Sequence, residues 1–186
     1  MGQISGLPAH VLIVHFVVVA VPLAALLLVA AALWPAARRR LGLATPVVAL
    51  VTLLSVPVAT NAGEWLQRRV PNDPLVRNHV RLGDSLLPWA IGLVVVAAAV
   101  WAVDRVAARA GAEREPVPVG AVGDTSERPV RETSALTGPA VRIVLAVLAV
   151  VVAAGSIVQV YRIGESGARA AWNTTAQHNP TGGGDD

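Results

Sequence analysis

From Val11 to Leu33 the chain reads VLIVHFVVVAVPLAALLLVAAAL, an apolar run that only His15 and Pro22 interrupt. A helix that crosses about 30 Å of hydrocarbon needs roughly 20 largely apolar residues. The run is long enough for one crossing. Of the 186 residues, 54% are hydrophobic and only 15% are charged, which is typical of an integral membrane protein. The run therefore predicts a first membrane-spanning helix.

Three further apolar windows follow, at about residues 41–60, 86–103 and 143–160. Together the four windows predict an all-α, integral membrane four-helix bundle in one domain, residues 1–172. Residues 111–139 are rich in Pro, Gly and charged side chains and predict a cytoplasmic linker, and residues 173–186 predict a disordered tail.

The third helix is expected to begin well before its apolar window. Asp73 followed by Pro74 is a good helix start, because aspartate caps the first turn and proline fits the first helical position. We expect one helix from Pro74 past Val103 toward Ala110. Trp89 and Trp101 at the ends of the window are interpreted as interfacial anchors.

Arginine counts predict the orientation in the membrane. The connections on the side of Arg38, Arg39 and Arg40 carry nine arginines against six on the other side, and no lysine is present. Because Lys and Arg near the spans are retained in the cytoplasm, both termini are expected outside a bacterial plasma membrane.

Composition also excludes some kinds of site. There is no cysteine, so disulfides and cysteine-ligated clusters within this chain are excluded. The arginines are scattered through loops and form no concentrated stripe, so nucleic acid is not an expected partner.

Three histidines are the candidate functional residues. His10 and His15 lie at the outer end of the first span, and His79 precedes the third span on the same side. An ionisable residue inside a span is a functional candidate, although His15 could equally hydrogen-bond a carbonyl or Thr60 across a helix interface. The charge topology thus predicts an outward-facing histidine site.

A b-type haem is one hypothesis for this site, because histidine is the only common strong axial ligand in the chain. His10 and His15 are separated by about 140° around one helix, so one of them is expected to pair with His79. The expected depths of the side chains in the membrane favour His10 and His79 as ligands of a haem or another metal. Glu64 and Asp84 are then candidates to orient the ligands, with an Asp84–Arg81 ion pair as the structural alternative.

One segment invites an enzymatic interpretation. Gly164-Glu-Ser-Gly167 is similar to the Gly-x-Ser-Gly nucleophile segment of rhomboid proteases. Ser166 lies beyond the fourth span, however, and no later helix supplies a histidine base. We expect no catalytic residue here and instead a short interfacial helix over Ser166 to Trp172.

Five motifs stand out together: Gly6-Leu-Pro-Ala-His10, Val14-His-Phe16, Thr60-Asn-Ala-Gly63, His79 and Tyr161-Arg-Ile-Gly-Glu-Ser-Gly-Ala-Arg-Ala-Ala-Trp172. They resemble a bacterial four-span family, particularly its actinobacterial members, filed as domain of unknown function number twenty-two thirty-one. The resemblance covers about residues 6–172. Family members often carry proline after the first histidine and histidine in place of Glu165, whereas this chain has Val11 and Glu165.

The resemblance implies a four-helix membrane bundle without an established activity. Some members are fused to Rieske-type iron–sulfur domains, which implies a place beside electron-transfer machinery. We therefore expect a haem-binding or accessory subunit of a membrane electron-transfer assembly, with an iron–sulfur partner or a homo-oligomer as the assembled state. The alternative is a non-catalytic bundle that stabilises a partner complex and uses its histidines only for packing; a transporter is a third interpretation.

Overall fold

The structure is a computed structural model, which describes residues 3–4, 7–68, 73–112 and 137–177. Its four long helices are α1 (Ala9–Leu33), α3 (Ala44–Gln67), α5 (Leu87–Ala112) and α7 (Pro139–Gln177). Two shorter helices, α2 (Pro35–Leu41) and α4 (Pro74–Asp84), precede α3 and α5. The all-α prediction is confirmed.

A two-residue antiparallel ladder precedes the first helix. Strand β1 (Gln3–Ile4) pairs with β2 (Leu7–Pro8), with Ile4 opposite Leu7. The ladder is too short to alter the fold class, but it turns the chain immediately before α1.

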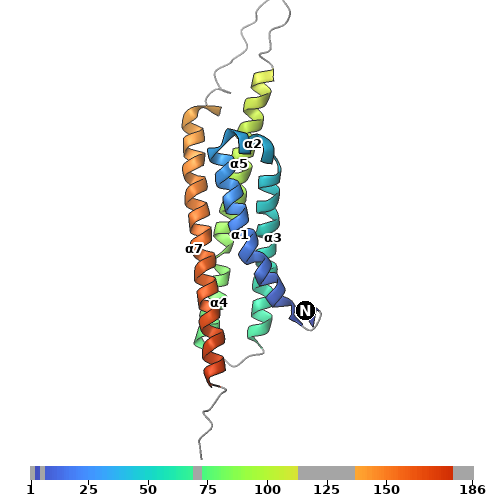
Figure 1. Cartoon of the computed structure of the whole chain (residues 1–186), viewed down its shortest axis with the longest axis vertical. Helices are drawn as coiled ribbons and strands as arrows, with labels where there is room; N and C mark the ends of the chain where they lie inside the picture. The colour runs from blue at the N-terminus through green and yellow to red at the C-terminus, as the bar shows by residue number, and fades with distance from the viewer. Residues whose placement is uncertain (1–2, 5–6, 69–72, 113–136, 178–186) are drawn as a thin grey trace, which may run out of the picture.

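The long helices run alternately up and down, and α1 packs against both α3 and α7 while α5 closes the other side (Figure 1). The start of α1, helix α4 and the end of α7 lie at one end of the bundle, and α2 lies at the opposite end (Figure 1). These are called the termini end and the α2 end below. The elements that carry His10, His15 and His79 thus share one end of the bundle.

Four segments are long and apolar enough to cross a membrane, and the chain is accordingly treated as a multi-pass membrane protein. They are Ile13–Leu33, Ala44–Trp65, Pro74–Ala112 and Pro139–Trp172. Large apolar side chains stay exposed around the bundle, including Val19, Leu26 and Val95, which are 59–67% exposed. Such a surface suits contact with lipid, because hydrocarbon replaces water as the solvent there.

Small side chains line the helix contacts. Without a hydrophobic force between helices in lipid, close backbone approach favours Ala, Gly, Ser and Thr at interfaces. The buried small residues are Ala20, Ala24, Ala25, Ala31, Ala32, Thr45, Ala49, Thr52, Ala59, Ala62, Ala90, Ala97, Ala149, Ala153, Ser156 and Ala170. Leu28, Leu93, Val21 and Val56 fill the remaining space between them.

The expected single helix from Pro74 to Ala110 is divided in two. Helix α4 ends at Asp84 and α5 begins at Leu87. Pro88 has no N–H to donate to the carbonyl four residues earlier, so a continuous helix is interrupted at this point. Asp73 caps α4 as predicted, with Oδ1 accepting from Leu75 N at 2.7 Å.

The expected short helix near the end of the chain also differs from the structure. Ser166 to Trp172 is part of the continuous helix α7 and not a separate interfacial helix, and α7 continues to Gln177, into the expected tail. Trp89 and Trp101 are half-buried, and the Trp89 ring lies against Gly155 of α7. Their role as interfacial anchors stays a prediction. The expected linker lies mostly outside the described residues, as do residues 178–186.

Candidate functional site

His79 is the histidine that the structure places between helices. It lies on α4, half-buried, and its Nδ1 atom is 2.9 Å from Ser166 Oγ on α7. The imidazole ring lies against Gly167, where an added Cβ would be 3.0 Å from His79 Cε1. Only glycine at position 167 leaves the ring this room without a shift of the ring or of α7. The contact thus joins α4 to α7 at the termini end.

Ser166 Oγ lies within hydrogen-bonding distance of two partners, His79 Nδ1 and the Ile163 carbonyl. Ser166 Oγ donates its single proton to the Ile163 carbonyl at 2.8 Å. When the hydroxyl proton is on this carbonyl, the same oxygen accepts from His79 and Nδ1 is the protonated nitrogen. In that neutral tautomer Nε2 is the acceptor.

The pairing of Ser166 with a histidine was missed by the sequence analysis, which looked for a base only in later helices. His79 comes from an earlier one, 87 residues before Ser166. The geometry nevertheless differs from that of a nucleophilic serine, whose proton is donated to the base. Here the Ile163 carbonyl, 2.8 Å away, is a second acceptor for that proton, and Ser166 lies inside a helix whose N–H groups are engaged in helical bonds. No oxyanion hole is available from them.

An apolar cavity of about 70 Å³ adjoins His79 and is called the His79 cavity. His79 and Thr60 are its polar wall residues. The apolar wall is made by residues from α1, α3, α4 and α7 together with Leu86: Val14, Val17, Val18, Val56, Ala59, Gly63, Val80, Gly83, Val160 and Ile163.

The other predicted site residues are not gathered around this cavity. His15 is exposed on the surface of α1, while its neighbour Val14 lines the cavity wall. The side chain of His10 lies outside the described residues. Among the residues that the structure describes, no group of three or more His, Asp or Glu side chains could hold a metal ion.

The two predicted acids also lie off the cavity wall. Gly63 lines the cavity rather than Glu64, and Gly83 rather than Asp84. Asp84 is exposed, and Arg81 donates to Asn78 Oδ1 at 3.1 Å in place of the expected ion pair with Asp84.

Gln159 is a second polar residue that the sequence analysis did not identify. It is 7% exposed on α7, and its Nε2 donates to the Leu82 carbonyl at 3.1 Å and to Ser85 Oγ. These bonds satisfy acceptors at the α4–α5 break, which is why a polar side chain is stable at this depth. The spacing of Ser156, Gln159 and Ser166, close to one face of α7, is the sequence signal that could have found it.

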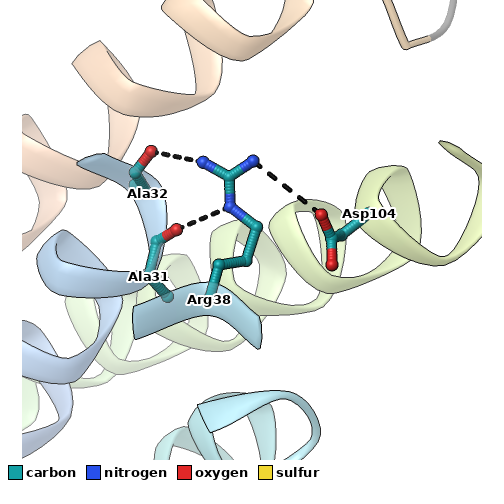
Figure 2. Close-up of polar contacts among 4 residues, drawn as sticks. All are labelled: Ala31, Ala32, Arg38 and Asp104. Carbon is teal, nitrogen blue, oxygen red and sulfur yellow. Dashed lines mark hydrogen bonds and ion pairs between the residues drawn. The ribbon is translucent and has the colours of Figure 1, made fainter. Parts of the chain in front are cut away.

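The opposite end of the bundle holds a separate polar arrangement around Arg38. Its Nε and Nη2 donate to the Ala31 and Ala32 carbonyls, each at 2.8 Å, and Nη1 is 3.9 Å from Asp104 Oδ1 (Figure 2). The two carbonyls belong to the last turn of α1, whose acceptors have no partner within the helix. Arg38 therefore caps α1 from α2.

No protein-family model, curated protein or solved structure matches this chain.

Proposed function

We propose that this chain is a non-catalytic accessory subunit of a membrane complex, in which the His79 contact fastens the termini end of the bundle. The main support for this proposal is the position of His79 between α4 and α7. Its Nδ1 is hydrogen-bonded to Ser166, and its ring fills the space over Gly167. The histidine thus performs a packing role that needs no cofactor. The exposed apolar helix faces support contact with lipid and with membrane-embedded partners.

One observation favours haem binding as a second candidate function. Histidines that ligate a metal usually donate the other ring N–H to a nearby acceptor, which fixes the ring. With Nδ1 as the donor, the bond to Ser166 has this form and Nε2 keeps its lone pair. When bound, a b-type haem would supply one-electron transfer.

The space beside His79 limits where such a haem would lie. Ligand pockets for molecules of this class measure about 300–1,000 Å³, whereas the His79 cavity has about 70 Å³. The interior of this bundle does not fit the group. Ligation by His79, His10 or His15 therefore requires a site completed by a second polypeptide, either a redox partner or another copy of this chain.

Location and partners are part of the same proposal. The arginine asymmetry supports a bacterial plasma membrane location with both termini outside. The resemblance to a four-span family with Rieske-fused members supports an iron–sulfur or other redox partner.

An absorption spectrum separates the two candidates. The full chain is expressed in haem-replete cells and purified in mild detergent, alone and together with proteins that co-purify. The accessory role predicts that the chain purified alone has no Soret band, and that any absorption of a co-purifying redox partner is unchanged in His79→Ala. A Soret band with sharp reduced-state bands that disappears in His79→Ala, and persists in the matched surface variant Asn78→Ala, would overturn the packing role in favour of haem.

A double-mutant cycle measures the packing role directly. We expect His79→Ala and Ser166→Ala to be coupled by about 0.5–1.5 kcal/mol in thermal or denaturant unfolding, since the two side chains share one hydrogen bond. His79→Ala paired with Ser85→Ala is the control cycle, because Ser85 bonds Leu82 and Gln159 instead. Additive effects of His79 and Ser166 would contradict the proposed clamp.

A further inference from the structure

A polar cavity of about 250 Å³ lies at the α2 end, between α1, α2, α3 and α5, and is called the α2-end cavity. Its charged wall residues are Arg38, Arg39, Arg105 and Asp104, which together carry a formal net charge of +2. Gly42 contributes to the wall at φ 45°, a conformation that glycine adopts without strain. The cavity is on the opposite end of the bundle from His79 and has no part in the proposed histidine role.

Two buried polar groups in this wall have no hydrogen-bond partner among the described residues. They are Thr45 Oγ1, on a residue that is only 3% exposed, and Trp101 Nε1. A buried donor without an acceptor costs free energy comparable to a lost hydrogen bond. The indole N–H can only donate, and the threonine hydroxyl has a proton to donate. The cavity thus presents donors that lack an acceptor.

The arginines add further donors. Two N–H groups of Arg38 are used on the Ala31 and Ala32 carbonyls, and its Nη1 lies 3.9 Å from Asp104 (Figure 2). That separation is about 1 Å longer than a charge-assisted hydrogen bond, so the carboxylate leaves Nη1 available. Arg105 lies over the Trp101 ring at 5.3 Å from the centroid, and Arg39 is exposed at the rim. Donors converge on the cavity from three helices.

We propose that the α2-end cavity binds the phosphate group of an anionic phospholipid. A phosphate offers several acceptor oxygens and a negative charge, which matches a wall with a net positive charge and unpartnered N–H and O–H donors. The position of the cavity along the bundle indicates that the phosphate belongs to a lipid. The cavity lies where the candidate span Ile13–Leu33 ends and exposed Trp34 begins the turn into α2. Basic pockets between spanning helices are known to take lipid headgroups.

Binding is measured on the full chain in maltoside micelles, by native mass spectrometry and by thermal unfolding. The three probes are phosphatidylglycerol, phosphatidylcholine and inorganic phosphate at equal concentrations. We expect one phosphatidylglycerol per chain and a rise in Tm of about 3–6 °C at ten times its dissociation constant. Phosphatidylcholine and inorganic phosphate should give little shift. Saturable binding of inorganic phosphate that competes with the lipid would overturn the assignment to lipid.

Matched variants locate the site. Arg39→Gln should weaken phosphatidylglycerol binding about fivefold, the effect of one arginine at a lipid surface. Arg40→Gln makes the same charge change one residue further, on an exposed side chain outside the cavity wall, and should leave binding unchanged. Equal losses in the two variants would show a diffuse charge effect and would refute a defined site.

Thr45→Val tests the buried hydroxyl. Without lipid the variant should be at least as stable as the wild type, because it removes an orphaned polar group of similar shape. With phosphatidylglycerol it should bind about tenfold more weakly, and Trp101→Phe makes the equivalent test if Thr45→Val fails to fold. Asp104→Asn, which removes the one negative charge, should bind more tightly. Unchanged affinity in both Thr45→Val and Trp101→Phe would overturn the proposal.

Discussion

Individual glycines allow aromatic side chains to lie directly against a helix backbone in this bundle. At Gly155 an added Cβ would overlap the Trp89 ring, and at Gly167 it would press on His79. At Gly164 on the same helix the space is open. Two glycines of α7 are therefore sites where a large flat ring from α4 or α5 rests on a bare helix backbone, as is common between helices in membranes.

Gly155→Ala is expected to destabilise the fold by about 1–3 kcal/mol, because Trp89 must leave its place to admit the methyl group. The thermal midpoint of the detergent-solubilised chain is the measurement. Gly164→Ala is the matched control: it should be neutral or slightly stabilising, since alanine favours helix over glycine and meets no neighbour. A Gly155→Ala variant as stable as this control would contradict the Trp89 contact.

At the scale of elements, both ends of the bundle depend on side chains that satisfy helix termini. Arg38, on the short helix α2, caps the last carbonyls of α1. Gln159 donates to the Leu82 carbonyl near the break between α4 and α5, where Pro88 interrupts the helix. Each contact holds a short helix against a long one. Removing either side chain would leave carbonyls without donors in a poorly hydrated place.

Arg38→Met should lower stability by about 2 kcal/mol, which corresponds to roughly 4–8 °C in Tm, because it keeps an apolar stem but removes the donors to Ala31 and Ala32. Arg40→Met, an exposed position on the same helix, should change stability by less than about 0.5 kcal/mol. Equal effects of the two changes in thermal unfolding would show that Arg38 is not a specific cap.

For the whole molecule, the alternating helices place the histidine-bearing elements and the end of α7 at one end and Arg38 to Arg40 at the other (Figure 1). The two ends therefore differ in chemistry. Arginine retention in the cytoplasm predicts that the α2 end faces inward.

Cysteine labelling tests this orientation cleanly because the chain has no cysteine of its own. In intact cells a membrane-impermeant maleimide should label Asn78→Cys and should label Arg40→Cys only after the membrane is permeabilised. Both positions are exposed, so accessibility in the folded chain does not bias the comparison. Labelling of Arg40→Cys before permeabilisation, with Asn78→Cys protected, would reverse the proposed topology.

The sequence alone predicted four long helices that run alternately up and down. In hydrocarbon every backbone polar group must be satisfied internally, so four apolar runs of this length can only be helices. Asp73 and Pro74 likewise predicted the start of α4, because capping depends on neighbours in the chain. These features depend on residues that are close together in the chain, so a single sequence is enough to predict them.

Which helix faces meet could be learned from the packed fold alone. Helix α1 is apolar all round, so hydrophobic periodicity alone does not say that Val14 turns toward the His79 cavity while His15 stays exposed. Ser166 and His79 meet across 87 residues, and Thr45 shares a cavity with Trp101 through the rotation of α3 and α5 about their axes. Rotation is set by small residues and rings fitting across interfaces, a property of helix pairs that no single run of sequence contains.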